Sequence, residues 1–422
     1  MTLGGNSPHK GNKPLPLQPG TSAIPTEDFF EPGARRMSPA EVRVNNERAV
    51  LTAIATSDGA SAADLARRTG LVPQSIARIL LDLENAGLLV RGEARKGFRG
   101  QPATPIHINP QGAFSIGCEL GWRHYHIMLR DLAGNVLGEH RRQYDYPHAA
   151  TIFDEIGSVT RLLMNLIPAD KTDRVIGMGL AAPSTIFRNL DLLGAPEEQR
   201  LAWENVDIAE AAASATGLPV TLFNDGNAAC WGELVAMPSP RPTDMVYLTI
   251  GTFVGSGLIA DGHLWEGAGG HGADLGATFV TDGHDAPRHV HIVASIYALE
   301  KQLLGAGLAV PADRPSQWDW DSLDPVASNW IDGAAKWLAL ALINTRAITE
   351  FELAVIDGVL PQAVLDRLVA SIGTHLDTMP MLTLDHPRVA KGRLGDSAAA
   401  MGAALMPIYR RFFSRKAADT GL

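Results

Sequence analysis

The stretch GLPVTLFNDGNAACWGE, residues 217–233, decides which fold the chain adopts. Its apolar run ends at the adjacent residues Asn224 and Asp225, where we expect a strand to stop and its carboxyl end to open into a cleft. A carboxylate at such a strand end can take a proton from a ligand hydroxyl or simply hold that hydroxyl. The stretch therefore raises the question of whether the chain performs chemistry on its ligand or only binds it.

The chain has 422 residues and 45% hydrophobic content, which is enough to bury more than one core, so we expect two or three globular units. No apolar run approaches the roughly 18 to 20 residues that span a bilayer, and the first 20 residues lack the apolar core of a secretory signal. We therefore expect a cytoplasmic protein without membrane contact. Cys118 and Cys230 are the only cysteines, and we expect them to be buried as small apolar residues.

The net charge of -10 is unevenly distributed along the chain. Residues 1–40 carry four basic and three acidic side chains, residues 41–105 carry nine and seven, and the remainder carries 23 and 36. Because an acidic body does not attract nucleic acid, any DNA contact must be concentrated in the slightly basic front portion.

That front portion divides into two parts. Residues 1–38 are rich in Pro, Gly and polar residues without a period, which is typical of a disordered or loosely ordered arm. From about residue 42, three short amphipathic segments follow, each ended by a Gly at a plausible helix C-cap. This spacing predicts a helix-turn-helix with one preceding helix, within a DNA-binding domain that spans residues 39–110.

The third segment predicts a recognition helix. Its apolar residues at spacings of three and four form one buried stripe: Ile76, Ile79, Leu80 and Leu83. Gln74, Ser75 and Arg78 lie off this stripe, and such residues reach base edges and phosphates from a helix in the major groove. The alternative is an ordinary solvated helix face.

A Gly-rich tip follows, between two extended runs. Arg95, Lys96 and Arg99 crowd this tip, as in the wing of a winged helix, where they would contact phosphates or enter the minor groove. A surface hairpin with incidental charge is the alternative.

The rest of the chain, residues 111–422, alternates apolar strands with helices. FSIGCELGW (114–122) and HYHIMLRDLAGNVLGEHRRQY (124–144) predict a β-hairpin opening with a turn at AGN, and residues 175–183 and 244–264 predict further strands with Gly at their ends. This pattern predicts two α/β lobes of the actin and hexokinase type with a ligand cleft between them.

The order of motifs resembles the ROK family, which groups bacterial sugar kinases with sugar-responsive repressors that carry an N-terminal winged helix. The resemblance extends from about residue 43 to about residue 412. Besides the winged helix, it is carried by IGCELGWRHYHIMLRDLAGNVL (116–137), GMGLAAP (177–183), GLPVTLFNDGNAACWGE (217–233), YLTIGTFVGSGLIADGHLWEGAGG (247–270) and GRLGDSAAAMGAA (392–404).

In family kinases, the Asp that matches Asp225 is the general base on the sugar hydroxyl, and the Asn that matches Asn224 binds the sugar. The phosphate loops differ from the kinase pattern. Glu119, Gly121 and Trp122 stand where an Asp-x-Gly-x-Thr loop is usual, and Phe253 replaces a Gly in the second loop, which keeps Gly251 and Thr252. The added bulk predicts that ATP binding is impaired, because phosphate oxygens must meet backbone amides there.

The zinc motif of the family is also altered. Ala277 stands in place of the zinc-binding His and the cysteines are missing, so we expect neither the structural zinc nor another cofactor. Asp274 matches a sugar-binding Glu, and His291 matches a second one. We interpret His284, Asp285, His289 and His291 as a solvated or hydrogen-bonded group, although whether this cluster binds a metal stays open.

The resemblance implies a DNA-binding transcriptional regulator, specifically a repressor of carbohydrate-related genes, whose kinase-derived cleft senses a sugar or sugar derivative without enzymatic activity. The expected ligand residues are Asn224, Asp225, Gly251, Thr252, Asp274 and His291. The expected partners are operator DNA, the sugar and further copies of the chain in a homodimer or dimer of dimers. The alternatives are an active sugar kinase with Asp225 as base, and a regulator whose cleft no longer binds a small molecule.

Overall fold

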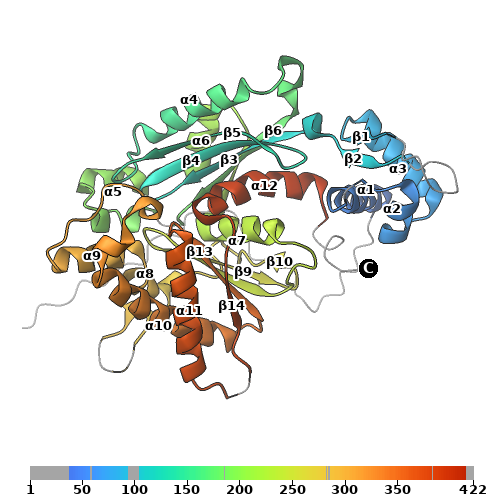
Figure 1. The fold of residues 1–422 in the computed structure, drawn as a ribbon. Helices are drawn as coiled ribbons and strands as arrows, with labels where there is room; N and C mark the ends of the chain where they lie inside the picture. Colours follow the sequence, from blue (N-terminus) through green and yellow to red (C-terminus); the bar gives the residue numbers. More distant parts are fainter. Residues whose placement is uncertain are drawn as a thin grey trace, which may run out of the picture. The chain divides into compact units, whose positions relative to one another are not determined.

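The structure is a computed structural model, which describes residues 38–57, 59–93, 104–184, 186–281, 283, 286–382 and 384–414. Three helices open the described chain: α1 (Pro39–Ala55), α2 (Ala62–Thr69) and α3 (Pro73–Asn85). They are followed by the antiparallel pair β1 (Leu89–Arg91) and β2 (Ile106–Ile108), which lies beside them in Figure 1. The predicted winged helix is thus confirmed in its helices and in the two strands that flank the wing.

The start and the end of α1 both differ from the sequence prediction. Helix α1 starts at Pro39, because Ser38 and Glu41 form a capping box in which each side chain bonds the other residue's backbone N–H. Its C-cap is Thr56, so the expected glycine cap is wrong for this helix. Gly70 does cap α2 in the left-handed conformation at φ 70°, as expected.

The first lobe is built on a five-stranded sheet in the order β5-β4-β3-β6-β7. The strands are β3 (Phe114–Leu120), β4 (His124–Asp131), β5 (Val136–Gln143), β6 (Val175–Ala182) and β7 (Val220–Asn224). Pairing is antiparallel among β3, β4 and β5 and parallel among β3, β6 and β7. Helices α4 (Ile152–Met164), α5 (Glu197–Glu204) and α6 (Ile208–Thr216) bury apolar side chains in one core with this sheet.

The second lobe has a sheet in the order β10-β9-β8-β13-β14. Its strands are β8 (Met245–Ile250), β9 (Val254–Ala260), β10 (His263–Leu264), β13 (Leu353–Gly358) and β14 (Arg388–Lys391). A separate antiparallel pair consists of β11 (Phe279–Val280) and β12 (Arg288–His289). The helices are α8 (Val290–Val293), α9 (Ile296–Gly305), α10 (Val326–Arg346) and α11 (Gln362–Thr378). The expected two-lobed α/β architecture is confirmed.

Short 3-10 helices complete the described structure. They are η1 (Pro110–Gly112), η2 (Ala169–Arg174), η3 (Ile186–Arg188), η4 (Asp191–Leu193), η5 (Leu275–Ala277), η6 (Pro315–Gln317), η7 (Trp320–Leu323) and η8 (Gly395–Ser397).

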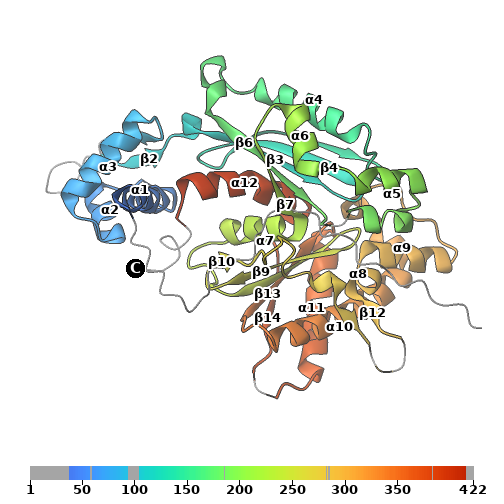
Figure 2. The same ribbon diagram turned by 180° about the vertical axis from the view of Figure 1, so that it is seen from behind.

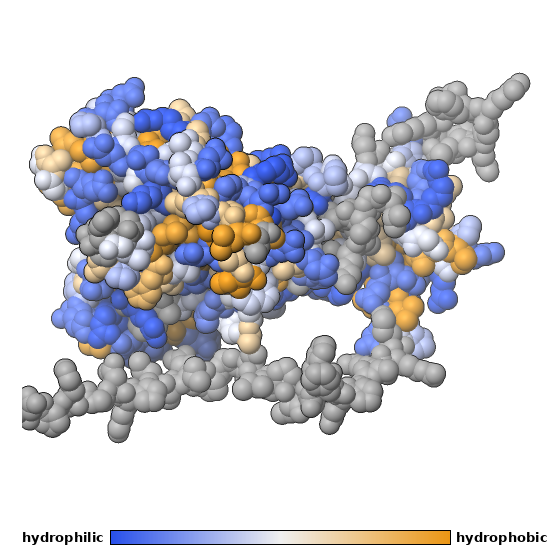
Figure 3. All heavy atoms as spheres, turned by 90° about the horizontal axis from the view of Figure 1, so that it is seen from below, coloured by the Kyte–Doolittle hydropathy of each residue, from blue (hydrophilic) through white to orange (hydrophobic). Residues whose placement is uncertain are grey.

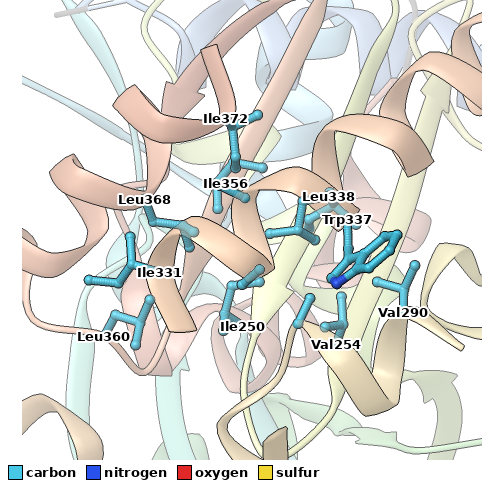
Figure 4. Close-up of a cluster of buried hydrophobic side chains, with 14 of the residues drawn as sticks. Ile250, Val254, Val290, Ile331, Trp337, Leu338, Ile356, Leu360, Leu368 and Ile372 are labelled. Atoms are coloured by element: carbon cyan, nitrogen blue, oxygen red, sulfur yellow. The ribbon is translucent and has the colours of Figure 1, made fainter. Parts of the chain in front are cut away.

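Helix α10 lies in the core of the second lobe. Figure 4 shows its Ile331 and Leu338 beside Ile250 and Val254 of the sheet and Leu368 of α11. Within the apolar stretch 334–348, Leu338, Ala341 and Leu342 are buried in this core, which supports a role in packing the lobe, whereas Ile348 beyond the helix end is 85% exposed.

Two further helices, α7 (Asp225–Ala236) and α12 (Ala398–Phe412), lie one above the other between the two sheets (Figures 1 and 2). Their backbones are in close contact, because a Cβ added to Gly402 of α12 would lie 1.7 Å from the carbonyl oxygen of Ala228 in α7. Only glycine permits this approach, which brings the two lobes together along one helix pair.

Helix α12 also completes the core of the winged helix. Ile408 and Phe413 are buried with Leu51 and Ile54 of α1 and with Ile76 of α3 in one apolar cluster. The domain predicted for residues 39–110 therefore shares its core with the far end of the chain.

Charged and polar residues cover most of the face in Figure 3, with apolar residues gathered near its centre. Within the described ranges, no helix combines the length and the apolar character that a bilayer span requires.

The glycine contact between the helices predicts a matched pair of outcomes. Replacing Gly402 by Ala forces α12 away from α7 and should lower the free energy of unfolding by about 1–3 kcal/mol. The control is Gly373→Ala in α11, where an added Cβ meets nothing within 4 Å and should stabilise the helix by about 0.5–1 kcal/mol. Urea unfolding measures both, and equal stability of the two variants would contradict the packing described.

Candidate functional site

The junction of β7 and α7 positions Asn224 and Asp225. Asn224 is the N-cap of α7, and its Oδ1 accepts the N–H of Asn227 at 3.0 Å while its Nδ2 donates to Ser184 Oγ at 2.9 Å. The Oδ1 of Asp225 accepts the N–H of Gly226 at 2.9 Å. The cap thus holds both side chains at the strand end, where the sequence predicted a cleft.

The second lobe meets this junction through β9. A Cβ on Gly226 would lie 2.3 Å from the carbonyl oxygen of Ser256, so the absence of a side chain allows α7 to start against this strand. Ser256 in turn donates to the carbonyl of Ala273 at 2.6 Å and accepts the N–H of Leu275 at 2.8 Å. These bonds hold the segment around Asp274 next to the junction.

Asp274 and His291 form the other side of the site. Nε2 of His291 lies 3.4 Å from Oδ1 of Asp274, while its Nδ1 is buried without a hydrogen-bond partner among the described residues. Burial opposes ionisation of Asp274, but hydrogen bonding and electrostatic attraction from the neighbouring His291 lower the pKa of this carboxyl overall. The pair thus offers a carboxylate and an imidazole to a ligand.

Four of the six expected ligand residues come together in one small pocket of about 70 Å³, which we call the Asp225 pocket. They are Asn224, Asp225, Asp274 and His291. The other two, Gly251 and Thr252, line an adjoining larger cavity instead. The pocket also takes side chains that the sequence interpretation missed: Ser184, Asn189, Ser256 and His271. The available signals were the position of Ser184 just beyond β6 and the glycines on either side of Ser256 and of His271, whereas Asn189 carried no such signal.

The carboxyl of Asp225 titrates abnormally. Burial, assisted by the negative charge of Glu119, raises its pKa to about 6. Burial also opposes ionisation of Glu119, but His124 lowers the pKa of that carboxyl overall, with further help from Arg141 and His126. Asp225 is therefore the carboxyl in this pair whose charge changes closest to neutral pH.

The larger cavity, of about 670 Å³, is lined by both altered phosphate loops. Trp122 of the first loop and Phe253 of the second are packed edge to face with ring centroids 5.0 Å apart. Beside them, Arg123 donates to Glu300 of α9 at 2.5 Å. Two contacts thus connect the lobes here, and Phe253 is only 6% exposed.

The region of the family zinc motif does not fit a zinc ion. Ala277 contributes no ligand atom, and both cysteines are buried elsewhere, as the sequence predicted. His284 and Asp285 lie outside the described residues, while His289 bonds the Ala277 carbonyl through Nδ1 at 2.7 Å. No group of three potential metal ligands gathers within the described part of the chain. The expectation that the protein uses no cofactor stays a prediction.

Three of the six predicted DNA-contacting residues lie in the described part of the chain, and the other three lie outside it. On α3, Gln74 and Arg78 are exposed and Ser75 is half-buried, whereas the apolar stripe of this helix is buried as predicted. Arg95, Lys96 and Arg99 lie outside the described residues. The exposed face of α3 is therefore free of the core, as a groove-reading surface requires.

One residue of α12 connects the pocket to the winged helix. Nη2 of Arg410 contacts both carboxylate oxygens of Glu266 at 2.9 and 3.1 Å, and its guanidinium lies 4.7 Å from the ring centre of Phe223, the residue before Asn224. The carbonyl of Glu266 accepts the N–H of Gly272, which lines the Asp225 pocket.

The same residue reaches α1. Nη2 of Arg48 donates to the backbone carbonyl of Arg410 at 2.9 Å, and Nε of Arg48 donates to that of Arg411 at 3.3 Å. The N–H of Ser414 donates to Thr52 Oγ1 at 2.8 Å. We call the series Gly272, Glu266, Arg410 and Arg48 the Arg410 link.

Comparison with known proteins gives two family matches. The ROK family model matches residues 115–409, and the MarR family model matches residues 45–99. A xylose repressor of Caldicellulosiruptor bescii is 26% identical over 301 residues, which cover 69% of this chain and 73% of the repressor.

Two solved structures share the fold. One is a ROK family transcriptional regulator described as a homolog of the E. coli MLC protein, with a TM-score of 0.66, 23% identity and coverage of 88% of this chain and 97% of that one. The other is a ROK family glucokinase from Streptomyces griseus in complex with glucose and AMPPNP, with a TM-score of 0.52, 20% identity and coverage of 70% and 99%.

The raised pKa of Asp225 predicts a pH-dependent effect of Asp225→Asn. The fold disfavours the charged form of Asp225, so this carboxyl lowers the free energy of unfolding most above pH 6. The destabilisation fades as the pH falls towards the pKa of an aspartate in the unfolded chain, near 3.9. The variant should therefore stabilise the ligand-free protein by up to about 3 kcal/mol at pH 7.5 and by less at pH 5. Thermal unfolding at both pH values measures this, with Asp170→Asn on the surface as the control for loss of one charge. A gain independent of pH, or a loss, would contradict the assignment.

Proposed function

The chain belongs to the ROK family, and on that premise we propose that it is a sugar-responsive, DNA-binding transcriptional repressor. The family match covers most of the chain, and the MarR family match falls on the helices α1 to α3. Relatives named as xylose repressors support a regulatory role over a catalytic one. The proposed ligand is a sugar or sugar derivative in the Asp225 pocket.

The observation that carries this proposal is the Arg410 link. Arg410 of α12 contacts Glu266 and Phe223, beside the Asp225 pocket, through its side chain, and it accepts a hydrogen bond from α1 of the winged helix through its carbonyl. A kinase has no need of such a connection. A repressor does, because its ligand must change how the DNA-binding helices are held.

The proposed switch follows from the position of the ligand. The Asp225 pocket takes residues from both lobes, so a bound sugar favours the closed arrangement over the open one by its differential affinity for the two. Closure moves the segment around Glu266 relative to α12, which repositions α1 and the attached α3. In a homodimer, which we propose from the two-fold symmetry typical of operators, this movement changes the spacing of two recognition helices.

The altered phosphate loops support a regulator without kinase activity. Phe253 brings its ring into contact with Trp122 where the family kinases have a glycine, and Arg123 is engaged by Glu300. Asp225 retains the position of a general base, but a base alone does not bind a nucleotide. An active kinase with an attached winged helix is the second candidate, favoured by this retained carboxylate.

The exposed face of α3 predicts the effect of Arg78→Ala on DNA binding. Loss of one contact to a base or phosphate should weaken binding to a selected operator by about 1–3 kcal/mol, because the side chain lies off the buried stripe and its removal leaves the fold intact. Fluorescence anisotropy with labelled DNA from an in vitro selection measures the change. Arg200→Ala in α5 is the control, and equal affinity of both variants would remove α3 from the interface.

The Arg410 link predicts that Glu266→Gln uncouples sugar binding from operator binding. The variant should bind the sugar and the operator with affinities near those of the wild type. In the wild type we expect the sugar to change the free energy of operator binding by about 1–3 kcal/mol, a typical coupling, and in the variant this change should be several-fold smaller. Operator titrations with and without the sugar measure this. Glu197→Gln, which breaks a comparable surface pair with Arg200, should leave the coupling intact. Full coupling in Glu266→Gln would refute the link.

A further inference from the structure

The Asp225 pocket adjoins a much larger space. The adjoining cavity has about 670 Å³ against about 70 Å³ for the pocket, and both are lined by Trp122, Asp225, Phe253 and Gly255. A ligand seated at Asn224 and Asp225 is therefore next to the larger cavity, and Trp122 and Phe253 lie on the boundary between the two spaces.

The charge of the larger cavity is unsuited to phosphate. Its lining includes six carboxyl side chains: Glu119, Asp145, Asp225, Glu300, Asp313 and Asp396. Arg123 is the one arginine or lysine among the described lining residues, and it is bound to Glu300. Asp396 is paired with Arg141 and Arg314 from outside the lining, so the excess of negative charge comes from the other carboxyl groups. This excess disfavours a phosphate, whereas carboxylates that accept hydrogen bonds suit a ligand rich in hydroxyl groups.

Aromatic side chains line the same space. They are Trp122, Tyr144, Tyr146, Phe253 and Trp318. The hydroxyl of Tyr144 lies within hydrogen-bond distance of the carbonyls of Gly121 at 2.8 Å and His124 at 2.6 Å, which fixes its ring beside the first altered loop. Flat apolar ring faces next to hydrogen-bond acceptors match the two surfaces of a pyranose ring, one of C–H groups and one of hydroxyls.

We infer that the effector is a neutral glycoside of at least two sugar units. Its terminal ring occupies the Asp225 pocket, and the attached unit passes Trp122 and Phe253 into the larger cavity. This inference rests on the proposed sugar response and adds the size and charge of the ligand. Because Trp122 and Arg123 belong to the first lobe and Phe253 and Glu300 to the second, such a ligand contacts both lobes in both spaces and favours their closure.

Isothermal titration of the full chain with matched pairs of sugars tests the inference. The pairs are xylose and xylobiose, glucose and cellobiose, glucose and maltose, and N-acetylglucosamine and its β-1,4 dimer. We expect at least one disaccharide to bind at least about tenfold more tightly than its own monosaccharide.

Two matched variants locate the second unit. Leu193 lines only the larger cavity, and Leu193→Trp should narrow it, removing the advantage of the disaccharide while monosaccharide binding persists. Leu201→Trp, at an exposed position on α5 that lines neither space, should keep the advantage. A thermal melt of each variant confirms folding.

Three results would overturn the inference. The first is a monosaccharide that binds as tightly as its disaccharide in every pair. The second is an advantage that survives in a folded Leu193→Trp variant, which places the second unit elsewhere. The third is no binding by any sugar, and this result alone also removes the proposed function, so the two failures are distinguishable.

Discussion

The contact between the backbones of α7 and α12 is the constraint on which the rest of the structure depends. Gly402 lies directly over the carbonyl of Ala228, and small residues along α12 pack against both sheets and against α7. One helix thereby joins the two lobes, and Ile408 near its end and Phe413 just after it are buried in the core of the winged helix. A change in the angle between the lobes cannot leave this helix unaffected, because close-packed interfaces transmit displacement rather than absorb it.

The placement of Asp225 gives that constraint a functional meaning. The residue begins α7, so the same helix that packs on α12 presents the Asp225 carboxyl, the proposed ligand contact, at its amino end. The Arg410 link runs beside this route and reaches α1 from the segment that holds Asp274. The proposed ligand site and the DNA-binding helices are thus connected by contacts between neighbours, without the need for a long-range effect.

Local patterns predicted much of this fold. The period of the apolar residues in α3, the turn between β4 and β5, and the strand end at Asn224 each depend on neighbours in the sequence, so they could be predicted from it. Contacts between distant segments could not. Nothing in residues 39–110 indicates that Ile408 and Phe413 complete their core, and no local signal pairs Arg410 with Glu266 or Arg48. The division of the ligand residues between two spaces also depended on tertiary packing around Phe253.

The central claim is that a ligand at Asp225 alters the winged helix through α12. Hydrogen–deuterium exchange of the full chain, with and without the sugar that binds most tightly, tests it most directly. The account predicts altered exchange in three places: residues 265–274 around Glu266, the last turn of α12, and α1 near Arg48. Altered exchange confined to the pocket, with α12 and α1 unchanged in the presence of saturating sugar, would contradict it.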